Sequence, residues 1–466
     1  MYGETHRNAS RGTPARRQAP VVRGRLVTGV LSEMLTDPLN FMLQSHERYG
    51  DVVRLSIPVA GLKIFAIRDP ELARRILLAD EKTIRKHDVI AVPMRAVVGP
   101  GLFTVSGPAW RAIRERHTPS FSRSEIEKLA PVVTGAAEHM FASWPAVEGD
   151  VDVVRAMSMA TLHVTLEGLL GLPDRSSSDA IYEAFEAVQE QLLSDPTTQL
   201  LRLLKWLPTA GNRRHRRAQL VLSDVVQRVI AHAGSQAQPA PHIAAILAAT
   251  HHETGRPPSA EQLRGEIINT LFSGHDTTAT TLALALCQLT RHPEELQKVE
   301  AEVARVLAGR APTIADVRQL EATAAVIHET LRLYPPAWAQ QRSTLVDLEY
   351  DGYSFPRGSV VTVSTWALHR HPAHWPDPEA FIPDRFAKHE SAARHPFAHI
   401  PFGAGPRTCI GRHLALTESV MLLALVLQRY ELRSTAGAPQ LRARLTLRPQ
   451  PIEIRVRRRE KAIGVA

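Results

Sequence analysis

The sequence has few cysteines and no long apolar runs. Cys287 and Cys409 are its only cysteines in 466 residues, too few for the disulfide framework of a small secreted protein. No apolar run reaches the roughly 20 residues needed to span a bilayer. Residues 1–20 are polar and arginine-rich and lack the apolar core of a secretory signal. We therefore expect a cytoplasmic protein without a transmembrane segment.

Aromatic residues are also scarce, at 5% of the chain, whereas basic residues are abundant. The 56 lysines and arginines outnumber the 47 acidic residues and give a net charge of +9, which permits nucleic acid, anionic lipid or an acidic protein as partner. A stacking surface for bases would interleave aromatics with basic residues, but only Trp206 lies close to a dense basic group. We expect no nucleic-acid partner, and DNA binding is the weaker alternative.

The hydrophobic pattern predicts a mainly α fold with small β-sheets. The composition, 44% hydrophobic and 22% charged, is that of a globular protein. Alternation predicts the strands and helical periodicity predicts the helices: strands at 51–57, 63–67, within 348–364 and near the C-terminus, and helices over most of 110–334 and at 413–428. No internal repeat or long linker divides the chain. We expect a flexible basic tail at residues 1–25 and a single domain at residues 26–466.

One predicted helix is unusually long and apolar on almost all sides. Ser259 with Gln262 three residues later forms a capping-box start, and the helical pattern continues to about Arg291, roughly 32 residues or about 48 Å. Such a helix runs through the middle of a large domain. Its centre nevertheless reads Ser-Gly-His-Asp-Thr-Thr at residues 273–278. A glycine and an acid–alcohol pair there indicate either a hydrogen-bonded packing defect or a chemical site, and the residues alone leave both open.

A second unusual segment, residues 401–411, has three glycines and two prolines around Cys409. The loop ends where a helix begins, so a thiolate there would be favoured by the helix N-terminus and by nearby Arg407. Such a thiolate suits a metal ligand, or a nucleophile if His413 served as its base. Cys287, in contrast, lies among leucines and is expected in the core.

The loop pattern Phe402-x-x-Gly405-x-Arg407-x-Cys409-x-Gly411 resembles the haem-binding loop of the cytochromes P450. Four further motifs follow the order and spacing of that family: Trp110-x-x-x-Arg114, the central segment 273–278, Glu329-x-x-Arg332 and the segment Phe381–Phe386. The resemblance covers residues 49–449. It implies the cytochrome P450 fold, with a long central helix over a haem and a cysteine-ligand loop. Ser273 and Asp384 are mild departures, from a small apolar residue and from glutamate.

The resemblance implies haem b as cofactor, with Cys409 as axial thiolate ligand of its iron. The other implied haem-binding residues are Trp110, Arg114, Arg342, Phe402, Gly405, Arg407 and Gly411; Arg342 rests on the alignment of its segment alone. Asp276 and Thr277 are implied to be catalytic. Thr277 would hydrogen-bond the dioxygen being activated, and Asp276 would relay protons from solvent.

Glu329 and Arg332 share one helix face because they are three residues apart. Without the resemblance, an exposed surface pair would be the simpler interpretation. With it, Arg385 is expected to reach the same carboxylate, so that these three residues pin an irregular segment to the helix.

The implied substrate pocket is apolar, and each of its residues could instead be ordinary core. The expected pocket residues are Val89, Leu271, Phe272, Gly274, Ala337 and Trp338. The implied activity is oxidation of an apolar small molecule, a terpenoid or other secondary metabolite, with O2. A fatty-acid hydroxylase with Arg95 as carboxylate anchor is the alternative, and a non-catalytic haem-binding protein is the more remote one.

The resemblance also requires a source of electrons. The chain ends at residue 466, too soon after Cys409 for a fused reductase domain. We expect a separate ferredoxin or flavodoxin with its own reductase. The cysteine-side surface should include Arg111, Arg116, Arg123 and Arg412, which suits an acidic redox partner.

Overall fold

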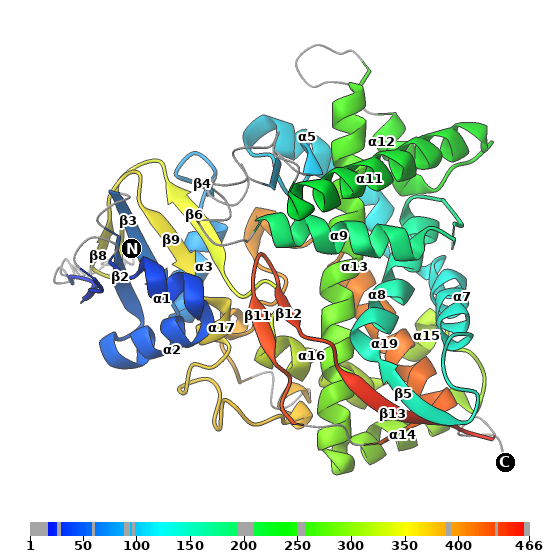
Figure 1. Cartoon of the computed structure of the whole chain (residues 1–466). Coiled ribbons are helices and arrows are strands. Elements are labelled where there is room, and N and C mark those ends of the chain that lie inside the picture. Colours follow the sequence, from blue (N-terminus) through cyan, green and yellow to red (C-terminus); the bar gives the residue numbers. More distant parts are fainter. Residues whose placement is uncertain are drawn as a thin grey trace, which may run out of the picture.

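The computed structural model describes residues 17–25, 29–57, 61–87, 94–95, 98–174, 176–192, 209–248, 257–387, 393–433 and 437–460. These residues form a mainly helical fold with four small sheets, which confirms the predicted fold class. Figure 1 shows α13 (Ala260–Arg291) running through the middle of the molecule, with the largest sheet on one side and most of the helices around it and on the other side.

The largest sheet has six strands in the order β1-β2-β3-β9-β6-β4. Its strands are β1 (Val21–Val22), β2 (Val52–Ile57), β3 (Leu62–Ile67), β4 (Ile84–Lys86), β6 (Gln340–Thr344) and β9 (Val360–Val363). The short helices α1 (Leu31–Thr36), α2 (Pro38–Tyr49), α3 (Pro70–Leu78) and α17 (Thr365–Leu368) lie with it, as does the hairpin of β7 (Leu348–Tyr350) and β8 (Tyr353–Phe355). The two predicted N-terminal strands are confirmed as β2 and β3, which pair antiparallel.

Helices make up most of the rest of the chain. Before α13 they are α5 (Gly107–His117), η2 (Thr118–Phe121), α6 (Arg123–Glu127), α7 (Ala130–Phe141), α8 (Val153–His163), the π-helical turn η3 (Val164–Leu169), α9 (Ser178–Leu192), α11 (Ala210–Ser235) and α12 (Pro241–Leu247). After it they are α14 (Pro293–Leu307), α15 (Ile314–Val317), α16 (Glu321–Leu333), η4 (Pro383–Phe386), η5 (Pro396–Ala398), η6 (Gly405–Arg407) and α19 (Arg412–Arg429).

Two further sheets use the C-terminal part of the chain. The three-stranded sheet has the order β10-β13-β5 and contains β5 (Glu148–Asp152), β10 (Tyr430–Arg433) and β13 (Glu453–Arg458). The hairpin of β11 (Leu441–Ala443) and β12 (Leu447–Pro449) lies beside α13 in Figure 1. Strand β5 was not predicted, because Glu148–Asp152 carries little apolar character and becomes a strand only by pairing with β13.

The long central helix is confirmed with the predicted boundaries. Ser259 is its N-cap, and both hydrogen bonds of the capping box with Gln262 are present. The helix has 32 residues, and nearly all of its side chains from Gly265 to Thr290 are buried. It reaches this environment because helices pack around it on every side, so an amphipathic pattern is not needed.

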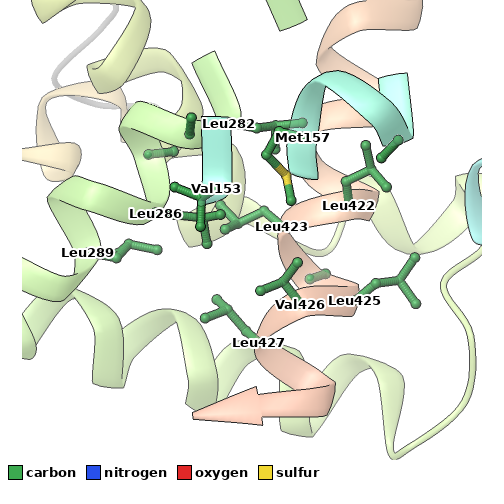
Figure 2. Close-up of a cluster of buried hydrophobic side chains, with 14 of the residues drawn as sticks. Val153, Met157, Leu282, Leu286, Leu289, Leu422, Leu423, Leu425, Val426 and Leu427 are labelled. Atoms are coloured by element: carbon green, nitrogen blue, oxygen red, sulfur yellow. The ribbon is translucent and has the colours of Figure 1, made fainter. Parts of the chain in front are cut away.

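The largest hydrophobic core lies where α13 packs against α8 and α19. Figure 2 shows leucines of α13 and α19 interdigitating with Val153 and Met157 of α8. Met157 and Leu286 are fully buried, and burying a side chain of this size stabilises the fold by roughly 1.5–3 kcal/mol. Cys287 belongs to the same cluster, as predicted, and burial raises the pKa of its thiol. This core joins the C-terminal halves of α13 and α19.

The N-terminal prediction needs a correction. Residues 1–16 lie outside the described part of the chain, but Val21 and Val22, placed in the expected tail, form β1. They pair in parallel with Arg54 and Leu55 of β2. The sheet therefore recruits the end of the expected tail, because an edge strand can accept a short partner whose own sequence pattern is weak.

Candidate active site

The cysteine loop is held rigidly at the start of α19. The backbone N–H of Cys409 donates to the carbonyl of Phe402 at 2.9 Å. Gly405 has a φ of 72°, and a Cβ there would lie 2.2 Å from the carbonyl oxygen of Leu77. Glycine is required at this position both for its left-handed backbone and for the close approach to the end of α3. Gly411 is the N-cap of α19.

The thiol of Cys409 is exposed to an interior space but is surrounded by protein. Burial raises its pKa, although a backbone hydrogen bond at Gly411 and the guanidinium groups of Arg114 and Arg412 act in the opposite direction. The cations that favour the thiolate are Arg114 and Arg412, in place of the expected Arg407, and burial opposes them. A bound metal ion deprotonates a coordinating thiol outright, so the site suits a metal ligand better than a free nucleophile.

His413, the only candidate base for a nucleophilic cysteine, is exposed and accepts a hydrogen bond from Arg412 at 3.1 Å. Within the described residues, no three histidine, cysteine or acidic side chains are grouped to hold a metal ion. Cys409 is thus arranged as a single protein ligand.

Beside the cysteine loop, three cationic side chains gather: Lys86 of β4, Arg342 of β6 and Arg407 of η6. Together with Glu81 they line one small pocket. Burial, followed by the charges of Arg407 and Arg342, lowers the pKa of Lys86 to about 7. Burial and Arg407 lower the pKa of Arg342 to about 10. The protein thus holds positive charge here that water does not solvate.

The other predicted haem-binding residues surround these cations. The Arg407 guanidinium lies over the Trp110 ring at 3.9 Å and donates to the carbonyl of Val105 at 3.0 Å. Arg114, one helical turn after Trp110 on α5, donates to the carbonyl of Thr408 at 2.8 Å. Phe402 is half-buried and packs against the main core. The structure therefore brings the predicted positions on α5, β6 and the cysteine loop together.

On α13, Asp276 and Thr277 are neighbours in sequence but face different surroundings. Ser273 is exposed and Thr277 is partly exposed, on a helix that is otherwise buried along its central length. The Thr277 hydroxyl donates only a long, 3.4 Å hydrogen bond to the carbonyl of Ser273. This face of α13 is open to an interior space, and the Thr277 hydroxyl is weakly engaged there.

Asp276 is fully buried in a polar cage that sequence reasoning did not find. Its Oδ1 lies 2.9 Å from Nε of Arg448 and accepts from the Gln189 amide at 3.2 Å, and its Oδ2 accepts from the Thr446 hydroxyl at 2.8 Å. Arg448 also binds Glu186 of α9. Burial lowers the pKa of Arg448, but the carboxylates of Asp276 and Glu186 outweigh it and the pKa is raised. The catalytic candidate is thus tied to both α9 and the β11–β12 hairpin.

Glu329 and Arg332 form a completely buried ion pair. Arg332 donates to both carboxylate oxygens, at 2.7 and 2.8 Å, and its side chain has no exposed area. It also donates to the carbonyls of His369, Pro378 and Ala380. These bonds attach α16 to the irregular chain that precedes η4.

Arg385 approaches the same carboxylate with its Nε at 3.5 Å. That contact is an ion pair without hydrogen-bond geometry, since Nε has no hydrogen-bond partner, while Nη2 donates to the carbonyl of Asp377 at 2.8 Å. The carboxylate of Glu329 also accepts from the Ile382 N–H at 2.9 Å. An exposed surface pair, the simpler interpretation of Glu329 and Arg332, is excluded by this burial.

The predicted pocket residues on α13 pack against neighbouring helices. Leu271 and Phe272 are buried in the core shared with α9 and α11, where the Phe272 and Phe185 rings lie 6.1 Å apart. A Cβ at Gly274 would lie 2.7 Å from the hydroxyl of Thr165 in η3, so this glycine is needed for close helix packing. Leu271 and Phe272 thus belong to a hydrophobic cluster and Gly274 to a close helix contact, and their role in a substrate pocket stays a prediction. Ser273 is the exposed residue of the segment.

Two other pocket candidates lie before β6. Ala337 is exposed, and the Trp338 indole donates to the carbonyl of Arg444 at 2.9 Å and packs against Leu447 of the C-terminal hairpin. Val89 lies outside the described residues. Trp338 thus supports the hairpin that also carries Arg448.

Lys86 and Glu418 are two further titratable residues that sequence reasoning missed. Lys86 belongs to a three-residue strand whose pattern carries no sign of the site, and only its pairing with β6 brings it to Arg342. Glu418 of α19 is buried, its Oε1 has no partner, and burial raises its pKa well above the usual value.

Among the described residues, no helix combines the length and apolarity needed to cross a membrane.

Comparison with known proteins gives a consistent result over nearly the whole chain. The cytochrome P450 family model matches residues 24–456. The chain is 33% identical to cyclooctat-9-en-7-ol 5-monooxygenase of Streptomyces melanosporofaciens, with 86% of each chain covered. It is 31% identical to cyclooctatin synthase of the same organism, covering 90% of this chain and 89% of the relative.

A human relative and a solved structure show the same family similarity at lower sequence identity. Human cytochrome P450 4F8 is 30% identical, with 82% of this chain and 78% of the relative covered. The crystal structure of the cytochrome P450DA heme domain superposes with a TM-score of 0.81 at 27% identity, covering 96% of this chain and 99% of that one. With the single-cysteine loop, the cationic pocket and the central helix in place, the chain belongs to the cytochrome P450 family of monooxygenases.

Proposed function

We propose that this enzyme oxidises an apolar small molecule, a terpenoid or other secondary metabolite, with O2 and electrons from a separate protein. The observation that carries the proposal is the geometry around Cys409: a lone thiol at an interior space beside a buried cationic pocket. The relative named cyclooctat-9-en-7-ol 5-monooxygenase supports the substrate class, since its name describes an unsaturated alcohol. Two unpaired cysteines suit the reducing cytoplasm that we propose as its location.

The residues present fit haem b. Basic side chains, Lys86, Arg342 and Arg407 among them, outnumber the single carboxylate of Glu81 in the pocket lining, which suits the two propionates of the porphyrin. Cys409 would ligate the iron, and the Trp110 ring would hold the Arg407 guanidinium that lies over it. Arg114 would hold the loop through Thr408. Burial first, and the neighbouring arginines second, lower the pKa values of Lys86 and Arg342, and an anionic group bound beside them would oppose both effects.

Haem bound through Cys409 supplies the reductive activation of O2, from which one oxygen atom enters the substrate and the other leaves as water. Thr277 is the residue placed to hold a hydrogen bond at the open face of α13, because its hydroxyl is only weakly engaged. Asp276 can pass a proton to this face only after its bonds to Arg448, Thr446 and Gln189 open. Glu329, Arg332 and Arg385 have a structural role, to fix the chain leading to the cysteine loop.

The proposed redox partner is a ferredoxin or flavodoxin with its reductase. Arg111 on α5 has 60% of its side chain exposed, and Arg412 is exposed at the start of α19. Arg116, expected on the same surface, instead binds Glu266 of α13 at 2.7 Å. We expect Arg111→Glu with Arg412→Glu to slow reduction by an acidic ferredoxin at low salt, with Arg217→Glu on α11 as control. Equal rates of reduction in the Arg111→Glu/Arg412→Glu variant and in the Arg217→Glu control would show that Arg111 and Arg412 do not belong to the docking surface.

Fatty-acid hydroxylation is the alternative activity. Its expected carboxylate anchor, Arg95, donates through Nε to the carbonyl of Thr104 at 3.2 Å and through Nη2 to the same oxygen. A guanidinium held this way has fewer free donors for a substrate carboxylate. The arrangement supports the neutral, apolar substrate.

The first test is an absorption spectrum of the reduced protein with carbon monoxide. We expect the long-wavelength Soret band of a thiolate-ligated haem, and its loss in Cys409→Ser. Titration with cyclic terpenoid alcohols and with long-chain fatty acids then separates the two substrate classes by the spin-state shift that each produces. No haem uptake by the wild type, even after reconstitution, would refute the proposed function. Product formation that depends on O2 and reductant excludes a purely haem-binding role.

A further inference from the structure

The cationic pocket contains an unfavourable pairing that the fold maintains. Lys86 and Arg342 are directly opposite each other in the antiparallel pair of β4 and β6. Like charges at such positions destabilise a sheet. Arg342 is buried and Lys86 is partly buried. The Lys86 ammonium has turned to the carbonyl and the ring of Phe103, with its Nζ 3.6 Å from the ring centroid. A third cation, Arg407, lines the same pocket.

Within the described chain, Glu81 is the carboxylate in this pocket lining, and of the three cations it contacts Arg407. Its Oε1 lies 3.1 Å from Nη2 of Arg407, and the two side chains are only 20% and 12% exposed. Its Oε2 is buried without a hydrogen-bond partner, and the nearest cation to it, the exposed Arg111, is 3.7 Å away. Glu81 is therefore engaged chiefly with Arg407 and retains an unused acceptor.

The position of Glu81 is set by the turn between α3 and β4. Asp80 accepts from the backbone N–H of Lys82 at 2.8 Å and from the Thr83 hydroxyl at 2.9 Å, which fixes the turn on both sides of Glu81. Arg407 is held in turn by the Trp110 ring and by Val105. A charge on such a fixed carboxylate, close to a poorly solvated pocket, acts with little screening.

We propose that Glu81 is a positioning residue that acts through Arg407 and sets the reduction potential of the bound haem. The proposal rests on the proposed function, in which this pocket receives the haem propionates. The Glu81 carboxylate offsets the positive charge of Arg407, which lines this pocket. Without the Glu81 charge, the positive charge of Arg407 acts on the porphyrin without that compensation. Because reduction adds one electron to the haem iron, excess positive charge favours the reduced state, and the midpoint potential rises.

The test compares the haem-loaded wild type with Glu81→Gln, Glu81→Asp and Glu115→Gln. Glu115 is an exposed carboxylate on α5, so its variant loses the same charge outside the pocket. The midpoint potential of each is measured with dithionite against a redox dye, after the carbon monoxide spectrum has shown thiolate-ligated haem. We expect a positive shift in Glu81→Gln, a smaller shift in the same direction in Glu81→Asp, whose carboxylate is one methylene further from Arg407, and no shift in Glu115→Gln.

Two outcomes overturn the proposal. A potential in Glu81→Gln equal to that of Glu115→Gln would mean that the Glu81 charge does not reach the haem. If the glutamine variant does not fold with haem, Glu81→Asp carries the test, and a wild-type potential there refutes it. Either result leaves the proposed function intact when the wild type binds haem through thiolate. A wild type that takes up no haem would instead refute the proposed function, and this inference with it.

Discussion

The buried pair of Arg448 and Asp276 allows a prediction with a matched control in the same chain. Arg448→Met keeps the length of the side chain and removes its charge. Asp276, which has no exposed area, then retains Thr446 and Gln189 but no cation. Removing one partner of a buried ion pair typically costs about 3–5 kcal/mol, because the other charge stays buried and unpaired.

The magnitude converts into a melting temperature. Unfolding entropy is about 2.1 cal/mol/K per residue, so a chain of 466 residues has roughly 1 kcal/mol/K. We expect the haem-loaded Arg448→Met protein to melt about 3–5 °C below wild type at pH 7, measured by far-UV circular dichroism. Replacing Asp276 with Asn in the same background should recover part of this loss, since no unpaired charge is then buried.

Arg455→Met is the control. Arg455 of β13 pairs with Asp150 at 2.9 Å, but the two side chains are 53% and 49% exposed. Exposed pairs contribute little to stability because water screens them, so this variant should melt close to wild type. Equal melting temperatures for Arg448→Met and Arg455→Met would refute the reasoning that burial makes the Asp276 cage costly to break.

Three further variants test other parts of the structure. Glu329→Gln leaves the fully buried Arg332 without a counter-charge, and we expect a loss of about 3–5 kcal/mol; a calorimetric melting temperature like that of wild type would contradict it. Burial lowers the pKa of His46 to about 4, so the unfolded chain takes up the proton first and the wild type loses about 3 kcal/mol as the pH falls from 6.5 to 4. The difference in melting temperature between pH 7 and pH 4.5 should be smaller in His46→Gln, and an unchanged difference would exclude His46 as a source of acid sensitivity. Gly405→Ala should impair folding and haem retention more than Gly358→Ala, because both have positive φ but only Gly405 faces a carbonyl within 2.2 Å; equal haem content in the two would count against the close-approach argument.

Local patterns were sufficient for the elements whose signals lie within a few residues. The capping box at Ser259 and Gln262 placed the start of α13 correctly, because both of its hydrogen bonds are made inside one turn. The alternating strands β2 and β3 and the buried Cys287 followed in the same way from short-range hydrophobic pattern. The motif around Cys409 also identified the family, because the backbone geometry of the loop requires glycines at fixed positions around the cysteine.

The pocket residues on α13 show where local pattern was not enough. Leu271, Phe272 and Ser273 are consecutive, and the family resemblance predicted the first two as pocket residues that could instead be ordinary core. A helix turns 100° per residue, so neighbours face different surroundings, and only the packing of α9 decides which face is core. The open residue is the polar Ser273.

The sequence by itself determined the long helix, the main strands, the cysteine loop and the family. Tertiary structure decided which charges meet: Arg448 with Asp276, Glu81 with Arg407, and Lys86 with Arg342. Partners so far apart in the chain leave no periodic or local signal in the sequence. A single charged residue is by default predicted to lie on the solvated surface, and only the fold shows that it is buried. Burial also changes side-chain chemistry, so the pKa of Lys86 falls and the pKa of the Cys409 thiol rises.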